Sequence, residues 1–156
     1  MARSAGWWAA RPRPVRWAAL LGEMGLLWWS SSRQLTGAGA GWPRALLHNA
    51  AHVVAYGGMA LLALLALRGG AAARRRDLWF AWGVAVAYGG VDEIHQRFVP
   101  GRTSSVADLL ADAAGAALAL SILLAARTGA VRWRRCGWAA GFVAAAAVLL
   151  ATFSDF

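Results

Sequence analysis

The stretch ALLHNAAHVVAYGGMALLALLAL, residues 45–67, decides the fold class. It runs for 23 residues without an Asp, Glu, Lys or Arg, and it is rich in alanine and leucine. About twenty apolar residues in a helix span the hydrocarbon core of a bilayer. A segment surrounded by lipid satisfies its own backbone hydrogen bonds only as a helix. We therefore predict a transmembrane helix here.

Four further apolar segments flank this one, and the full set covers residues 17–31, 45–67, 78–91, 106–126 and 137–153. The first and third are shorter than a full span, but each can extend into its polar flanks. None shows the alternation of a strand. We predict an all-α, polytopic transmembrane bundle of about five spans, which forms a single membrane-embedded domain over residues 1–156.

Composition and charge agree with a membrane protein. In a chain of 156 residues, 60% are hydrophobic, whereas a small soluble domain needs far more polar surface. The net charge of +9 comes from sixteen arginines, which fall between the hydrophobic blocks and not along one helix face. We therefore expect no nucleic-acid partner. Cys136 is the single cysteine, which excludes an intrachain disulfide and a cysteine-based zinc site.

The arginines also predict the orientation. Twelve of them flank the starts of the first, third and fifth segments, and four lie on the other side: Arg33, Arg44, Arg97 and Arg102. Because cytoplasmic loops carry the excess of positive charge, we predict a cytoplasmic N-terminus and an outer C-terminus. An alternative is that the first segment is a cleaved signal peptide, since Ala38-Gly39-Ala40 resembles a cleavage site. Cleavage would leave the other helices in place.

Polar side chains gather at the predicted outer ends of the second, third and fourth helices. They are His48, His52, Tyr56, Asp92, Glu93, Gln96, Asp108 and Asp112, with Arg97 and Arg102 in the connecting loop. Residues four apart share a helix face. Charged groups in membrane segments face the bundle interior or a water-filled cavity. We predict a polar pocket framed by these three helices, with His95 facing the outer loop.

Two helix starts carry capping signals. Asp77 follows an arginine run and is predicted to be the N-cap of the third helix. Ser105 and Asp108 have the spacing of a capping box at the start of the fourth helix.

The stretch DEIHQRFVPGRTSSVADLLADAAG, residues 92–115, resembles the signature of the VanZ-like membrane protein family. That signature has Asp-Glu-x-x-Gln, an aromatic residue, Pro-Gly-Arg and a Ser/Thr pair, followed by Asp, Asn and Gly. HNAAHVVAYGG, residues 48–58, resembles the family's His-x-x-x-Tyr element, and MGLLWWSSS, residues 24–32, resembles its first helix. The likeness covers a core of about residues 24–120. The segment at 137–153 is an additional C-terminal helix.

The chain departs from the family pattern at two places. His48-Asn49 stands where Asp-Lys is usual, and Asp112 stands where Asn is common.

The resemblance implies a cell-envelope role in the bacterial cytoplasmic (inner) membrane. The family is named for a protein associated with reduced susceptibility to the glycopeptide teicoplanin, and no agreed reaction comes with it. We expect the pocket to bind a polar head group of a membrane lipid or a lipid-linked envelope precursor, without a cofactor. The expected ligand-binding residues are His52, Tyr56, Asp92, Glu93, Gln96, Arg102, Ser104, Asp108 and Asp112.

Two other hypotheses stay open. A metal-dependent hydrolase of a lipid ester or amide would use His48 and His52, which are four apart, with one of the carboxylates. Against that, His48 lies at the helix boundary, where we expect it to be solvated. A purely structural protein would use the same residues as a salt-bridge and cap network, with Arg102 paired to a carboxylate. Its partner would then be another membrane protein.

Overall fold

The computed structural model describes residues 11–33, 41–102 and 104–154. All regular secondary structure in this part of the chain is helical. Five helices follow in order: α2 (Arg13–Ser31), α3 (Trp42–Arg68), α4 (Arg75–Gln96), α5 (Val106–Thr128) and α6 (Val131–Ser154). The predicted all-α bundle is thereby confirmed. The candidate cleavage site Ala38-Gly39-Ala40 lies outside the described residues.

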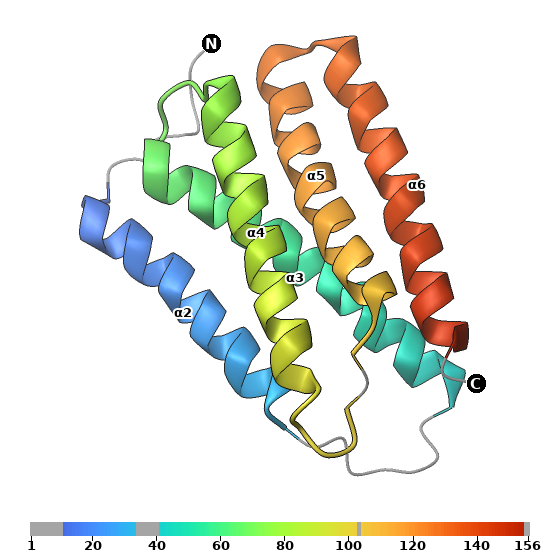
Figure 1. The fold of residues 1–156 in the computed structure, drawn as a ribbon. Coiled ribbons are helices and arrows are strands. Elements are labelled where there is room, and N and C mark those ends of the chain that lie inside the picture. Colours follow the sequence, from blue (N-terminus) through green and yellow to red (C-terminus); the bar gives the residue numbers. More distant parts are fainter. Residues whose placement is uncertain (1–10, 34–40, 103, 155–156) are drawn as a thin grey trace.

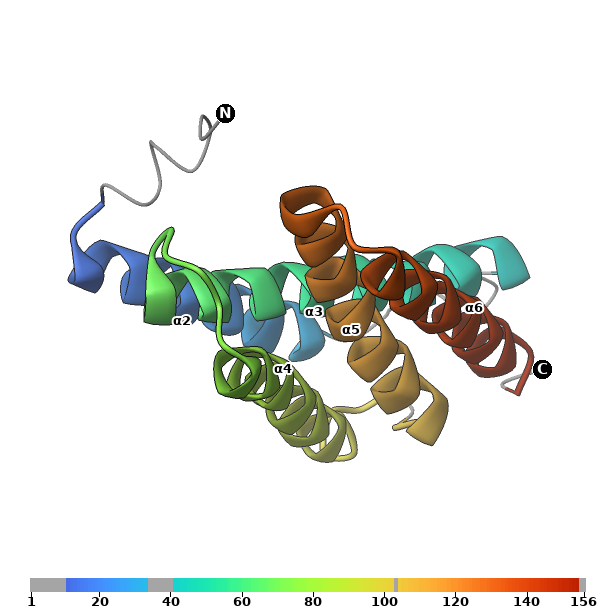
Figure 2. The ribbon, with the colours of Figure 1, turned by 90° about the horizontal axis from the view of Figure 1, so that it is seen from above.

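Each helix returns the chain to the opposite end of the bundle (Figure 1). The starts of α2, α4 and α6 and the ends of α3 and α5 therefore share one end, at the top of Figure 1, which we call the arginine-rich end. The starts of α3 and α5 and the ends of α2 and α4 share the other end. Seen from above, α3 runs along the molecule, and α4, α5 and α6 cross one side of it (Figure 2).

Three described helices are long and apolar enough to cross a bilayer. They are Trp42–Arg68, Val106–Thr128 and Val131–Phe153, which contain 18-residue stretches with mean hydropathy of 1.9, 2.1 and 1.9. Helices α2 and α4 do not meet both conditions, so crossing by all five remains a prediction, as does the cytoplasmic N-terminus.

The helix ends correct one capping prediction and confirm the Ser105 half of the other. Helix α4 begins before Asp77, so this residue is not the N-cap; its Oδ2 instead accepts from the backbone N–H of Arg74 at 2.8 Å. The helix starts early because the arginines ahead of Asp77 favour helix and present their charges to water. Ser105 is the N-cap of α5, and its hydroxyl oxygen accepts from the N–H of Ala107 at 3.0 Å.

Glycines set the approach of α3 to α5. A Cβ on Gly115 would lie 2.4 Å from the carbonyl oxygen of Val53, and a Cβ on Gly57 would lie 3.1 Å from the carbonyl oxygen of Gly115. Small residues let helix backbones approach this closely. The contact brings the turn of α3 that carries His52 against the turn of α5 that carries Asp112.

Candidate functional site

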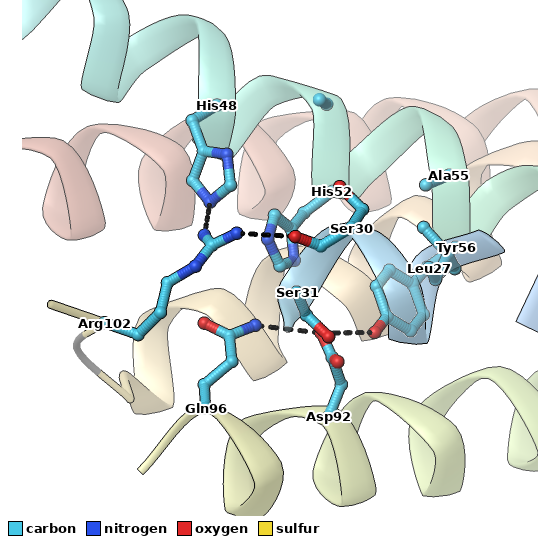
Figure 3. A pocket seen from close by; sticks show the side chains of 11 residues that line it. Leu27, Ser30, Ser31, His48, His52, Ala55, Tyr56, Asp92, Gln96 and Arg102 are labelled. Atoms are coloured by element: carbon cyan, nitrogen blue, oxygen red, sulfur yellow. Dashed lines mark hydrogen bonds between the residues drawn. The ribbon is translucent and has the colours of Figure 1, made fainter. Parts of the chain in front are cut away.

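A cavity of about 110 Å³ lies near the ends of α2 and α4, opposite the arginine-rich end. Figure 3 shows the side chains that line it. We call it the polar cavity. Three helices and one loop line it, through Leu27, Ser30 and Ser31 of α2, His48, Ala51, His52, Ala55 and Tyr56 of α3, Asp92 and Gln96 of α4, and Arg102.

The walls differ from those we predicted. Helix α2 supplies one wall, whereas α5 contributes no residue to the described lining. The oblique course of α3 explains the exchange, because its turns from His48 to Tyr56 pass close to the end of α2 while α5 packs on another face.

His52 and Asp112 form a buried pair behind this cavity. His52 Nδ1 lies 2.9 Å from Asp112 Oδ1, and the aspartate side chain is fully buried. Because a carboxylate oxygen accepts, Nδ1 carries the hydrogen of this bond. The ring nitrogen that Asp112 does not engage is Nε2. Asp112 therefore orients an imidazole in the cavity wall without lining the cavity itself.

One of the two carboxylate oxygens of Asp92 has hydrogen-bond partners. Its Oδ2 accepts from the amide of Gln96 at 2.9 Å and from the hydroxyl of Tyr56 at 3.4 Å (Figure 3). Its Oδ1 is buried and has no hydrogen-bond partner among the residues that the structure describes, and the residue is only 3% exposed. A buried polar atom left in that state costs about 1–3 kcal/mol. A ligand that donates to Oδ1 would recover this energy.

Arg102 lines the cavity from the loop after α4, and its contacts correct the predicted carboxylate pair. Nη2 donates to the carbonyl of Ser30 at 3.1 Å, Nε donates to that of Arg33 at 3.3 Å, and Nη1 lies 3.0 Å from His48 Nε2. The guanidinium thus caps the end of α2, where unsatisfied carbonyls favour a cation.

His48 is half-buried in the lining, and so it is not the solvated boundary histidine that we predicted. Since arginine only donates, His48 Nε2 accepts from it and the ring hydrogen sits on Nδ1.

Opposing effects act on the Arg102 guanidinium. Burial lowers its pKa, while the carboxylates of Asp92, Glu93 and Asp108 raise it. A guanidinium remains protonated under either influence. The contacts described above use three of its five N–H groups. Within the described contacts, the other two N–H groups have no partner.

Three other predicted residues brace the loop after α4. Glu93 Oε2 accepts from the backbone N–H of Ser105 at 2.8 Å, and Ser104 Oγ accepts from Arg97 Nε at 3.2 Å. Asp108 lies buried in the first turn of α5. Glu93 thus takes the place in the capping box that the spacing assigned to Asp108. In the described structure these three residues support the polar cavity from outside its lining.

Comparison with known protein families identifies the family of this chain. The model of the VanZ/LLP1 family matches residues 7–127, which is most of its length. The chain belongs to the VanZ/LLP1 family. The match includes α2 to α5 and ends before α6. Comparisons with curated proteins and with solved structures gave no match. The apolar helices and the family together make this chain a membrane protein.

The position of His95 differs from our prediction. Its ring stacks on Trp28 with centroids 3.9 Å apart, and Nε2 lies 2.9 Å from the hydroxyl of Ser32. His95 therefore joins α4 to the end of α2 and does not simply face the loop.

The α2 residues of the polar cavity were missed by the site prediction, although the likeness of residues 24–32 to the family's first helix was an available signal. Apolar and hydroxyl side chains such as Leu27 and Ser31 carry no chemistry that marks them in isolation.

The metal site that the hydrolase hypothesis requires is not formed in the described part of the chain. No group of three His, Cys, Asp or Glu residues there could hold a metal ion. The contacts explain why. His48 Nε2 faces the positive guanidinium of Arg102, and His52 Nδ1 is engaged by Asp112. A cation between the two histidines would meet the repulsion of Arg102.

Proposed function

We propose that the polar cavity binds the small polar end of an envelope lipid or lipid-linked envelope precursor, on the outer side of the bacterial cytoplasmic membrane. One observation carries the proposal. Asp92, whose Oδ1 is a buried acceptor without a described partner, and Arg102, a charged donor, line the same cavity. A site with both charges selects a ligand that has both an acidic group and a hydrogen-bond donor.

The hydrogen-bond donors and acceptors of the cavity residues indicate which ligand group each residue would bind. Arg102 donates to a phosphate or carboxylate oxygen, and charge-assisted bonds of this type are the strong ones. Asp92 Oδ1 accepts from a hydroxyl or ammonium group of the same ligand. His52 adds a third contact through Nε2, held in place by Asp112.

The volume of the polar cavity limits the size of the group that it can bind. Pockets for whole small molecules are roughly 300–1,000 Å³, whereas the polar cavity has about 110 Å³. Only the end of a head group fits, and the hydrocarbon chain of the ligand stays in the bilayer. That arrangement suits a lipid better than a free solute, because the chain adds binding energy outside the cavity.

Asp92→Asn is the sharpest test. The amide oxygen of the asparagine is retained by the two donors Gln96 and Tyr56, so its NH₂ turns to the cavity and replaces an acceptor with a donor. Loss of a charge-assisted bond of about 1.5–3 kcal/mol weakens binding roughly 10- to 100-fold. Arg97→Gln is the matched control, since Arg97 is exposed and lies outside the lining.

Binding is measured by isothermal titration of detergent-purified protein with a polyprenyl phosphate, and separately with phosphatidylglycerol and phosphatidylethanolamine. The proposal expects at least one of these probes to bind wild type and Arg97→Gln equally and Asp92→Asn much more weakly. Equal affinity of Asp92→Asn and wild type for every bound probe contradicts it.

A cellular arm addresses the glycopeptide role. In a bacterial host, expression of the wild-type chain is expected to reduce susceptibility to teicoplanin. Expression of Asp92→Asn to the same level in the membrane is expected to leave the host as susceptible as the empty vector does. If both proteins give the same protection, the polar cavity has no part in that phenotype.

A further inference from the structure

A second cavity, unrelated to the polar one, lies between α5 and α6. Its volume is about 850 Å³, and we call it the α5–α6 groove. It is lined by Leu118, Ser121, Ile122, Ala125, Trp133, Arg134, Gly137, Trp138, Gly141 and Phe142. These residues belong to the later part of α5 and the first part of α6, so the groove lies towards the arginine-rich end of the bundle (Figure 1).

The groove joins an apolar surface to a concentration of positive charge. Trp138 and Phe142 are both 78% exposed. Arg134 is the charged member of the lining, and Arg127, Arg132 and Arg135 lie close to it in sequence. The sequence contains no acidic residue from position 113 to position 154 to balance them. Uncompensated arginine beside an apolar channel is the chemistry that recognises anionic lipids.

We infer that the α5–α6 groove holds an acyl chain of an anionic phospholipid, with the lipid phosphate at Arg134. Helices α5 and α6 are apolar enough to cross a bilayer, so the groove opens to lipid chains. Tryptophans such as Trp133 and Trp138 are typical of the membrane interface, where the head group lies. The positive-inside orientation places this lipid in the cytoplasmic leaflet.

A second copy of the chain is a poorer occupant. A two-fold dimer through this face would bring the two arginine groups together, and like charges in an interface are strongly unfavourable. The small residues of the groove are also already used within the chain. A Cβ on Gly137 would lie 3.6 Å from Ser121 Cβ, and one on Gly141 would lie 3.7 Å from Leu118 Cδ1.

Native mass spectrometry of the delipidated, detergent-purified protein tests the charge component. Dioleoyl phosphatidylglycerol and dioleoyl phosphatidylcholine are titrated separately. Attraction between one basic residue and an anionic lipid is worth about 1 kcal/mol, or about fivefold in binding, and we assign it to Arg134 because Arg134 lines the groove. Arg134→Gln should therefore bind phosphatidylglycerol about fivefold more weakly than wild type. Arg135→Gln, which removes the same charge next to the groove, should change the binding little.

Gly141→Leu tests the apolar component, because the new side chain occupies the groove and its Cβ makes only ordinary contact. Introduced into the Asp92→Asn protein, in which the polar cavity no longer contributes, it should lose phosphatidylglycerol binding while keeping the helical content of its parent. The inference is overturned if Arg134→Gln and Arg135→Gln weaken binding equally, or if Gly141→Leu in the Asp92→Asn protein binds phosphatidylglycerol as its parent does. A dimer that Gly141→Leu converts to monomer overturns it in favour of a second copy.

Discussion

Gly115→Ala is predicted to destabilise the bundle, although alanine is the better helix former. The added methyl group would lie 2.4 Å from the carbonyl oxygen of Val53, 2.8 Å from its Cα and 2.9 Å from its carbonyl carbon. All three obstacles are backbone atoms, so no side chain can rotate away. The helices α3 and α5 must move apart, and the His52–Asp112 contact one turn away loosens with them.

The change in the free energy of unfolding follows from two opposing effects. Overpacking a well-packed interior costs about 1–3 kcal/mol, and an immovable backbone obstacle places this case at about 3. Replacing glycine by alanine within a helix recovers about 1 kcal/mol. The net loss is about 2 kcal/mol, which for a chain of this size lowers the unfolding temperature by about 4–8 °C.

Thermal unfolding in detergent, followed by circular dichroism, measures the effect. Gly83→Ala is the matched control, because a Cβ there would meet no described atom within 4 Å. It keeps the gain in helix propensity and has no clash, so its unfolding temperature should rise slightly. Equal stability of Gly115→Ala and Gly83→Ala would show that the contact between α3 and α5 does not exclude a methyl group at position 115.

Three further outcomes are expected. Glu93→Ala removes the carboxylate that accepts from the N–H of Ser105, and it should lower the free energy of unfolding by about 2 kcal/mol. Glu93→Gln should lose less than half of that, because its amide oxygen still accepts. Equal losses in the two variants would show that the hydrogen bond to Ser105 contributes little. Elemental analysis should find less than about a tenth of an equivalent of zinc in both wild type and His52→Ala, because two histidines without a third ligand hold the metal weakly. A full equivalent of zinc in wild type that is lost in His52→Ala would support the hydrolase hypothesis. In a background without the native cysteine, cysteines placed at His95 and Gly101 should react with an impermeant maleimide from outside the cell; reaction only after lysis would place the polar cavity on the cytoplasmic side.

Helix positions were largely predictable, because apolar length and charged boundaries are properties of the local sequence. The segment predicted at 106–126 corresponds to α5, Val106–Thr128. The segment predicted at 137–153 falls short of α6, Val131–Ser154, which includes the arginines ahead of it. Arginine is a good helix former and reaches water with its long side chain, so charge marks the limit of the apolar core and not the end of the helix.

The gathering of polar groups at one end was also predictable, since each group falls at the corresponding end of its own helix. Their partners were not. Arg102 contacts carbonyls at the end of α2, and Glu93 caps α5, because the crossing of the helices determines which backbone groups come within reach. Sequence spacing reports neighbours along one helix and carries no information on crossing angles. The separation into cavity residues and bracing residues therefore required the fold.

The central claim is that the polar cavity selects a lipid by its head group. The most direct measurement is the lipid composition carried by the purified protein, analysed by mass spectrometry in a Gly141→Leu background that fills the α5–α6 groove. We predict one phosphate-bearing lipid at about one molecule per protein, enriched over the bulk membrane, present with Arg97→Gln and lost with Asp92→Asn. The same lipids in the same amounts in all three proteins would contradict the claim.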